Sequence, residues 1–506
     1  MNLDGVTFGD ETLAVETFAL DVRRQGHIQP DPARVIAQLF VPGHYLSGGR
    51  EGQASGVVEH ILALGDDEVD ETLASIVDRF ADRHRDLAET FRHHADRIGN
   101  RLDPANELSE ERRLLLGATF THEYAVEAAA LCNPSAVALP DQTRTPAGAL
   151  RFVMSVRQIG EGHRSSVGFR TGLLDARGDV TMEDPGPFTT AGTIGTSTLD
   201  ADTFRGLARR RDDTEAIGWV LDRLGHHFTI PELEARLSQL EAQHDTRRNV
   251  SKTITWLRDL AARAYTAQFP ASSELAERVL YPATSIESNG MEDARFVRFV
   301  DDDGAVTYYA TYTAFDGRAI AQQLLATTDF LTFTVSPLLG AAAANKGMAL
   351  FPRRINGQLV ALSRYDGASN AIAFSDNIRE WPTATPLACP TEAWEAIQVG
   401  NCGPPIETSD GWLVLTHGVG PMRTYSIGAM LLDLGDPTKV IGRLRRPMLT
   451  PLPGEQDGYV PNVVYSCGAV LHDATLLIPF GIADSSISFA TVPMPALLGA
   501  MIDATV

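Results

Sequence analysis

The run Asn289-Gly290-Met291-Glu292-Asp293-Ala294-Arg295 leads directly into the strand-like segment Phe296-Val297-Arg298-Phe299-Val300. Consecutive side chains in a strand point to opposite faces. The pattern therefore predicts that Glu292 and Asp293 lie in different environments, with Arg295 on the side of Asp293. A nearby arginine lowers the pKa of an aspartate, whereas burial in a ligand-filled pocket raises it. Asp293 is thus a candidate general acid, and a surface turn with a salt bridge is the alternative.

Turn signals recur after this run at intervals of roughly 50 residues, a spacing typical of repeat architectures. They are Asp303-Gly304, Asn356-Gly357 and Asp410-Gly411. Asn-Gly and Asp-Gly favour hairpins because such turns need positive φ angles. Further hairpins are expected at His472-Asp473 and, earlier in the chain, at Ala147-Gly148. These units predict a mainly β chain folded as a five-bladed β-propeller, with a β-sandwich as the alternative.

Helical patterns occupy the start of the chain and a stretch within the β region. From Asp67 to Asn100, apolar residues recur every three, four or seven positions, which is typical of an amphipathic helix or a helical pair. Ser109 followed by acids predicts a capped helix start, and a further helix is expected from Val250 to Ala267. The expected organisation is a helical region over residues 1–118 and a propeller domain over residues 119–506, with a helical insertion at about residues 200–275.

The formal net charge of −22 argues against nucleic acid or an anionic membrane as a partner. A bound anion would have to be held locally by a few basic residues. The start of the chain lacks the basic and apolar segments of a signal peptide. No run approaches the roughly 18 apolar residues of a membrane span. A cytoplasmic location is therefore expected.

No metal site is expected. The four cysteines form no CxxC pair, which also argues against a zinc ribbon or a disulfide framework. The histidines His84, His93 and His94 lie among arginines and acids with no accompanying signature of a metal site. We interpret them as part of a solvated helix face.

Polar residues recur at comparable places in the five units. Each propeller unit contributes an inner strand and a loop to a central funnel, so these side chains would meet there. In chain order they are Arg157, His163, Asp293, Arg295, Lys346, Arg364, Gln398, Asn401, His417, Arg423, Tyr425, Asn462 and Asp484.

Several linked motifs are similar to those of one known family. Gly290–Arg295 matches Gly-x-Glu-Asp-Pro-Arg, Leu350–Gly357 matches Leu-Phe-Pro-x-x-Ile-Asn-Gly, and Gly411–Val419 matches Gly-Trp-Leu…His-Gly-Val; Leu431–Pro437 and Gly481–Asp484 also fit. Over roughly residues 125 to 500 the chain resembles glycoside hydrolase family 130, the inverting β-mannoside phosphorylases and β-mannosidases with a five-bladed propeller. The N-terminal helices and the Gly160–His163 loop look like the longer branch of the family, which includes β-1,2-oligomannan phosphorylase.

The resemblance implies a reaction and a set of site residues. Asp293 would protonate the glycosidic oxygen through a sugar hydroxyl, while phosphate attacks the anomeric carbon from the opposite face to yield α-mannose 1-phosphate. The substrate would be a β-mannoside, with β-1,2-linked oligomannosides expected. Inorganic phosphate would be a co-substrate and no cofactor is implied; homo-oligomerisation is left open. The residues implied to hold phosphate are Arg157, Arg364, His417 and Tyr425, and those implied to bind substrate are Asn133, His163, Arg295, Lys346, Asn401, Asn462 and Asp484.

Two positions depart from the family pattern. Ala294 replaces a proline, which loosens the backbone, and Gln398 stands where a lysine is often found, which removes one phosphate-binding charge. An inverting β-mannosidase, in which water replaces phosphate and a second carboxylate acts as base, is therefore an alternative. A non-catalytic carbohydrate-binding propeller is another. Arginines at the phosphate positions favour the phosphorylase, because they offer charge-assisted and bidentate donors to an anion.

Overall fold

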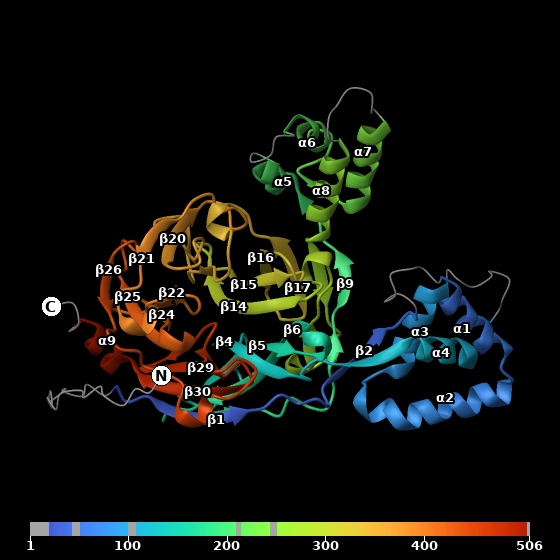
Figure 1. The fold of residues 1–506 in the computed structure, drawn as a ribbon, viewed down its shortest axis with the longest axis horizontal. Coiled ribbons are helices and arrows are strands. Elements are labelled where there is room, and N and C mark those ends of the chain that lie inside the picture. The colour runs from blue at the N-terminus through green and yellow to red at the C-terminus, as the bar shows by residue number, and fades with distance from the viewer. Residues whose placement is uncertain (1–19, 43–50, 100–107, 209–213, 243–249, 503–506) are drawn as a thin grey trace, which may run out of the picture.

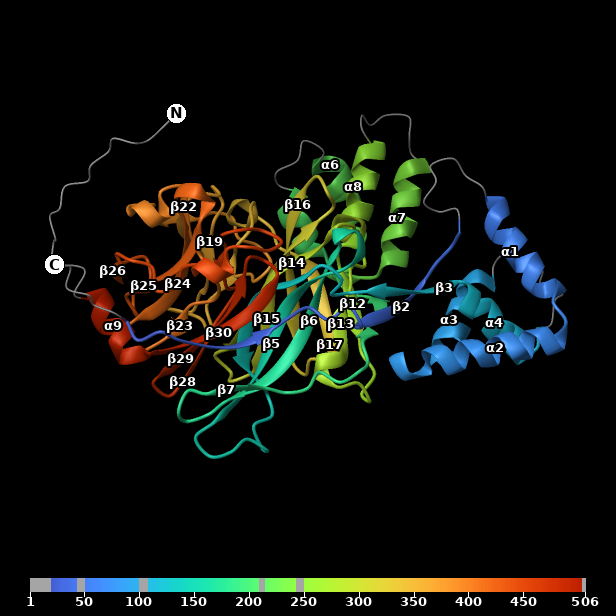
Figure 2. The same cartoon turned by 60° about the horizontal axis from the view of Figure 1, so that its bottom comes forward.

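The computed structural model describes residues 20–42, 51–99, 108–208, 214–242 and 250–502. The chain is mainly β, as predicted, and most of its helices form two groups set apart from the sheets (Figures 1 and 2). The first group comprises α1 (Glu51–Ala63), α2 (Asp66–Phe80), α3 (Leu87–Ile98) and α4 (Glu110–Thr119). The second comprises α5 (Ala201–Ala208), α6 (Thr214–Leu221), α7 (Ile230–Ala242) and α8 (Val250–Ala262). Each group has an apolar core of its own.

Antiparallel meanders follow one another along the chain. The first consists of β4 (Ala130–Ala138), β5 (Leu150–Ile159), β6 (Ser165–Leu174) and β7 (Val180–Met182). The second consists of β14 (Gly290–Val300), β15 (Val306–Phe315), β16 (Ile320–Thr327) and β17 (Thr332–Pro337). The third consists of β18 (Ala349–Leu350), β19 (Leu359–Ser363), β20 (Asn370–Ser375) and β21 (Thr385–Ala388).

The fourth meander consists of β22 (Gln398–Asn401), β24 (Trp412–Val419), β25 (Tyr425–Leu432) and β26 (Val440–Arg443), with β23 (Ile406–Glu407) beside β24. The fifth consists of β27 (Val464–Tyr465), β29 (Thr475–Ile482) and β30 (Ser486–Pro493), with β28 (Val470–His472) beside β29 and α9 (Met494–Ile502) after it. The remaining strands are short: β2 (Val35–Leu39), β3 (Thr121–Ala125), β8 (Thr190–Ala191), β9 (Thr193–Thr196), β10 (Leu199–Asp200), β11 (His227–Phe228), β12 (Tyr265–Gln268) and β13 (Arg278–Leu280).

Apolar side chains join each meander to the next and the last to the first. Five separate clusters do so, since β-strands bury alternate side chains against a facing sheet. Contributors from the two sides are, in order, Phe169 and Phe296, Val297 and Ala361, Leu362 and Trp412, Leu415 and Ile478, and Phe489 and Phe152. The meanders therefore form a closed series of packed sheets.

The N-terminal region contributes a strand to the last sheet. β1 (Arg23–Ile28) pairs antiparallel with β30, from Arg23 opposite Thr491 to Ile28 opposite Ile487. This pairing places the start of the described chain against its end (Figure 2). The helical patterns before residue 119 gave no indication of this strand, because its partner lies more than 450 residues away in sequence.

The predicted hairpins are confirmed. Asp303-Gly304 joins β14 to β15, Asn356-Gly357 joins β18 to β19, and Asp410-Gly411 joins β23 to β24. His472-Asp473 lies between β28 and β29, and Ala147-Gly148 between β4 and β5. Asn356 and Gly357 have φ angles of 52° and 80°, as the turn chemistry requires.

The helix predictions are confirmed with two corrections. Ser109 caps α4 by accepting a hydrogen bond from Arg112 N at 3.2 Å. The helix expected from Val250 to Ala267 ends at Ala262, and Tyr265–Gln268 instead forms β12 between β9 and β17. There Tyr265 is buried and donates to Glu287 at 3.1 Å, so tertiary pairing overrides the helical pattern.

The histidine-bearing face of the N-terminal helices is not fully solvated. His84 and His94 are buried, and only His93 is exposed. The Nε2 of His84 lies 2.8 Å from Glu123, and the Nδ1 of His94 lies 2.7 Å from the Thr121 hydroxyl. Both partners belong to β3, which packs against this face. No helix in the described ranges is long and apolar enough to cross a membrane.

Candidate active site

The segment around Asp293 forms a β-bulge in β14. Glu292 pairs with Thr313 and Arg295 with Thr311, so β14 holds one extra residue relative to β15. Asp293 takes this irregular position with a φ angle of 57°. A bulge interrupts the alternation of side chains along a strand. The prediction that Glu292 and Asp293 occupy different environments is therefore wrong.

Arg157 of β5 contacts both carboxylates. Its Nη2 lies 2.7 Å from Glu292 Oε1 and its Nη1 lies 3.6 Å from Asp293 Oδ1. Lys346 forms an ion pair with the other oxygen of Glu292. The two cations expected to contact ligands are thus held by Glu292, a residue that the strand pattern had assigned to a separate environment.

Asp293 is enclosed by donors and cations. Asn133 donates a hydrogen bond to its carboxylate, and the Nη2 of Arg295 lies 3.8 Å from Oδ2. Burial raises the pKa of Asp293, but the charges of Arg295, Arg157 and Lys346 and the hydrogen bond from Asn133 together hold the pKa below its ordinary value. The carboxyl group is therefore ionised near neutral pH in the protein alone.

Arg295 is fully buried and all its nitrogens contact protein groups. It donates to Cys402 O at 2.9 Å, to the backbone oxygen of Asp293 at 2.9 Å and to the Tyr465 hydroxyl at 3.0 Å. With its donors so engaged, Arg295 holds the bulge in place from behind.

A second group consists of Arg364, His417 and Asn401. The Nε of Arg364, both ring nitrogens of His417 and the Oδ1 of Asn401 are buried and make no hydrogen bond of normal geometry within the described chain. Buried polar groups left unpaired are costly and rare in native proteins. Their convergence indicates that a polar ligand binds here.

Two glycines make room for this group. Gly400 lies opposite His417 in the ladder between β22 and β24. A Cβ on Gly400 would lie 2.3 Å from the Nε of Arg364 and 2.6 Å from the Cε1 of His417. Gly347, with a φ angle of 94°, has a similar close approach to the Arg364 side chain. Only glycine permits Arg364 and His417 to occupy these positions.

His417 acts as a neutral group. Burial, with the charges of Arg364 and Arg295, lowers the pKa of His417 well below its ordinary value. Its ring is stacked on Tyr425 at 6.1 Å and lies 4.9 Å from the Tyr465 ring. Of the cations expected to bind phosphate, His417 therefore offers a hydrogen bond without a charge, and Arg364 supplies the charge of this group.

Tyr465 joins the two groups. Its hydroxyl accepts from Arg295, which contacts Asp293, and its ring contacts His417. The carboxylate and the unpaired donors therefore belong to one continuous site.

Asp484 provides a further carboxylate in the turn between β29 and β30. Burial raises its pKa to about 6 against the opposing charge of Arg157, and the negative charge of Asp293 adds to the increase. Asp484 and Asp293 thus differ in protonation although they share the neighbour Arg157.

Two expected substrate residues lie near the rim. His163 is exposed, and its Nδ1 lies 3.0 Å from the Tyr459 hydroxyl. Asn462 accepts a hydrogen bond from the backbone of Tyr425 at 2.9 Å. No contact of either with Asp293 is recorded among the described residues, so the structure does not bring them to the acid directly.

Positive φ angles concentrate in the expected site residues. Asn133, His163, Asp293, Asn462 and Asp484 have φ angles of 50°, 61°, 57°, 60° and 48°. Such conformations are costly for residues other than glycine and are typical of functional sites. In the described ranges, no group of three or more His, Cys, Asp or Glu could hold a metal ion.

Comparison with known proteins gives the family. The family model described as beta-1,4-mannooligosaccharide phosphorylase matches residues 261–502. The 1,2-beta-oligomannan phosphorylase of Thermoanaerobacter sp. (strain X514) is 40% identical over 225 residues, which are 44% of this chain and 74% of that protein. The chain belongs to glycoside hydrolase family 130. The resemblance predicted from its motifs is confirmed.

Other members of family 130 are similar over comparable shares. The beta-1,2-mannobiose phosphorylase of Listeria innocua serovar 6a is 31% identical over 231 residues, which are 43% of this chain and 62% of that protein. A solved structure of beta-1,2-mannobiose phosphorylase from Listeria innocua, in complex with beta-1,2-mannobiose, aligns with 79% of this chain and 95% of its own. The sequence identity is 20% and the TM-score is 0.43.

Sequence reasoning missed two residues of this family 130 site. Glu292 was adjacent to the candidate acid, and the glycine before it was the one signal that the strand is irregular there. Tyr465 lies in the apolar run Val463-Val464-Tyr465, which is typical of core strands. Nothing in that run distinguishes a tyrosine whose hydroxyl faces a buried arginine.

Proposed function

We propose that this protein is an inverting glycoside phosphorylase that cleaves β-mannosides, with β-1,2-linked oligomannosides as substrates and α-mannose 1-phosphate as product. The observation that carries the proposal is the buried, unpaired donor group of Arg364, His417 and Asn401, joined to Asp293 through Tyr465 and Arg295. A hydrolase has no use for such a group, whereas a phosphate ion needs it. The names of the relatives support the substrate class.

The fold proposed for this function is a five-bladed β-propeller. The closed series of five packed meanders supports it, with β1 completing the last blade. The helices α1–α4 and α5–α8 are then additions to the propeller, and the site lies where strand ends and turns from successive blades meet.

In the proposed reaction, Arg364 and His417 hold phosphate beside the anomeric carbon. A phosphate oxygen forms a bond to that carbon as the bond to the leaving sugar oxygen breaks, with inversion. The proton of the Asp293 carboxyl passes through a sugar hydroxyl to the leaving oxygen. The phosphate charge, together with exclusion of water by the sugar, raises the pKa of Asp293. Substrate binding therefore supplies the protonated acid that the protein alone does not favour.

An inverting β-mannosidase is the second candidate because of Asp484. Its pKa of about 6 lets it act as a base near neutral pH, as the inverting hydrolase mechanism requires of a second carboxylate. Glu292 is less suited to that role, since Arg157 and Lys346 stabilise its ionised form.

One assay distinguishes these functions. The purified full chain is incubated with β-1,2-mannobiose, with and without phosphate, and the products are identified. We expect cleavage that depends on phosphate and yields α-mannose 1-phosphate, and the reverse reaction should release phosphate from that donor. Free mannose formed at the same rate without phosphate would establish the mannosidase instead. Binding without any cleavage would leave a carbohydrate-binding protein.

A further inference from the structure

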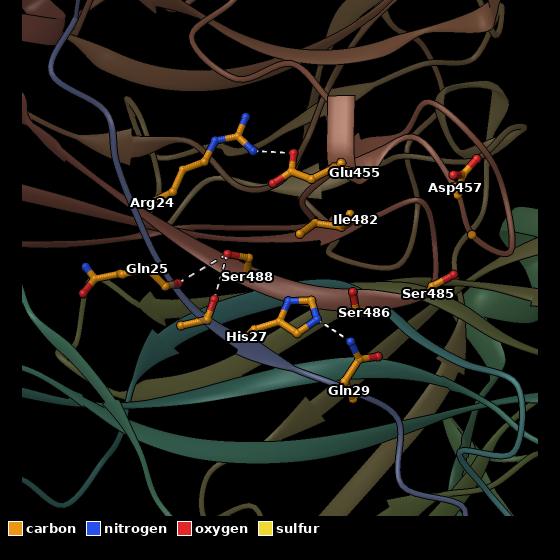
Figure 3. A pocket seen from close by; sticks show the side chains of 13 residues that line it. Arg24, Gln25, His27, Gln29, Glu455, Asp457, Ile482, Ser485, Ser486 and Ser488 are labelled. Atoms are coloured by element: carbon orange, nitrogen blue, oxygen red, sulfur yellow. Dashed lines mark hydrogen bonds and ion pairs between the residues drawn. The ribbon is translucent and has the colours of Figure 1, made fainter. Parts of the chain in front are cut away.

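A pocket of about 560 Å³ extends along β1 and β30, outside the group around Asp293 (Figure 3). β1 and Gln29 form one side, and the segment Gly454–Gly458 forms another. Ser485 and Ser486, at the turn between β29 and β30, close the end of the pocket. This volume lies within the roughly 300–1,000 Å³ typical of small-ligand sites.

The lining of the pocket suits an uncharged, hydroxyl-rich ligand. Its arginine, Arg24, is neutralised by an ion pair with Glu455 and also donates to Thr450 O at 2.6 Å. An anion would therefore find no free guanidinium here. Ile482 is the one side chain larger than glycine that is apolar among the described residues lining the pocket, so an apolar ligand would gain little. Serine hydroxyls, carboxamides and carboxylates remain, and these groups bond sugar hydroxyls in either direction.

The pocket adjoins the candidate active site through two shared segments. Ser485 lines the pocket and directly follows Asp484 in the same turn. Its hydroxyl accepts a hydrogen bond from the Tyr459 backbone at 2.6 Å. The Tyr459 side chain is 44% exposed, and its hydroxyl contacts His163. One turn thus contributes to both places, and an exposed tyrosine lies between them in the chain.

We propose that this pocket is a distal subsite that binds the sugar units of an oligomannoside remote from the bond being cleaved. The inference rests on the proposed function. It assigns preference for chain length partly to β1, which lies outside residues 261–502 that match the family model. A disaccharide would be too short to occupy both the distal subsite and the group around Asp293.

The test compares two substrates and three variants of the full chain. Gly454 lines the pocket, and a Cβ there meets nothing within 4 Å, so Gly454→Trp adds bulk without a backbone clash. Gly65 is equally open but lies before α2, so Gly65→Trp is the matched control. Asp457→Ala removes one exposed carboxylate of the lining. The quantity measured is kcat/KM with phosphate for β-1,2-mannotetraose divided by that for β-1,2-mannobiose.

We expect this ratio to fall about tenfold in Gly454→Trp and about threefold in Asp457→Ala, in keeping with the loss of one or two hydrogen bonds. It should be unchanged in Gly65→Trp. An unchanged ratio in Asp457→Ala and in a folded Gly454→Trp would overturn the subsite while leaving the proposed function intact. If the wild type cleaves neither sugar, the proposed function fails. Calorimetric titration with mannotetraose then decides the subsite: weaker binding to Asp457→Ala supports it, and equal binding overturns it.

Discussion

Asp293 lies in a β-bulge with a φ angle of 57°, and this conformation determines which groups reach its carboxylate. In a regular strand, Glu292 would point away from Arg157. The bulge lets Arg157 contact both carboxylates, so the charge state of each depends on the other.

At the residue scale, the Asp293→Asn substitution tests the general acid. Asparagine keeps the shape and one acceptor oxygen but cannot donate the proton. We expect phosphate-dependent activity to fall by at least about a hundredfold, while the melting temperature stays close to that of the wild type. Asp302→Asn, in the exposed turn at the other end of β14, is the matched control. Turnover like that of the wild type in purified Asp293→Asn would remove the assignment.

Glu292→Gln tests the shared arginine. Without the Glu292 charge, Arg157 and Lys346 act more strongly on Asp293 and lower its pKa further. A general acid must be protonated, so the fall in kcat at alkaline pH should begin about one pH unit lower than in the wild type. Glu407→Gln, which removes an exposed ion pair with Arg353, should leave the profile unchanged. An unchanged profile in Glu292→Gln would show that Glu292 has only a structural role.

At the scale of elements, α3 is attached to β3 through a buried histidine. Burial lowers the pKa of His94 to about 4, assisted by the charges of His93 and Arg97. The unfolded chain, with a histidine pKa near 6.5, binds a proton that the folded chain does not. Stability is therefore unaffected above about pH 6.5 and is lost as the pH falls from there towards 4.

The corresponding prediction concerns His94→Asn. Between pH 7.5 and pH 5, the wild type should lose roughly 2 kcal/mol of stability through His94, at about 1.4 kcal/mol per pH unit below 6.5. The variant should not show this part of the loss. Urea unfolding followed at both pH values, with hydrogen exchange of α3, measures it. His93→Asn, at the exposed neighbour, should behave as the wild type; equal acid loss in both variants would contradict the assignment.

β1 changes the expectation for truncation of the N-terminal region. Removal of residues 1–118 would delete the helices and also a strand of the last sheet. The exposed edge of β30 would then invite aggregation. Loss of solubility in such a truncation would therefore reflect β1 and would not establish a role for α1–α4.

At the scale of the whole molecule, a chain with a net charge of −22 must bind an anion through local donors. If phosphate binds at Arg364 and His417, it should stabilise the folded protein without sugar, by about 2.7 kcal/mol at a phosphate concentration one hundred times Kd. Thermal melting in increasing phosphate, at constant ionic strength set with KCl, measures this effect.

Arg364→Ala should abolish the stabilisation, because it removes the charged donor of the group. Arg318→Ala, at an exposed turn, keeps the wild-type response and controls for the change in net charge. An equal rise in melting temperature in wild type and Arg364→Ala would place phosphate elsewhere. No rise in the wild type would favour the mannosidase.

The sequence by itself determined the features that depend on neighbours in the chain. Asp-Gly and Asn-Gly turns need positive φ, so the hairpins and their spacing could be predicted, as could the cap at Ser109. The linked motifs also identified the family and singled out Asp293, Arg364 and His417.

Only the tertiary structure decided features that depend on distant residues. β1 pairs with β30 because the last sheet has a free edge, and Tyr265–Gln268 is a strand because two others flank it. The bulge at Asp293 brings Glu292 to Arg157, and Gly400 brings Arg364 beside His417. Hydrogen bonds and charges between distant segments outweigh local propensity at these positions, and no periodicity within a window of sequence contains that information.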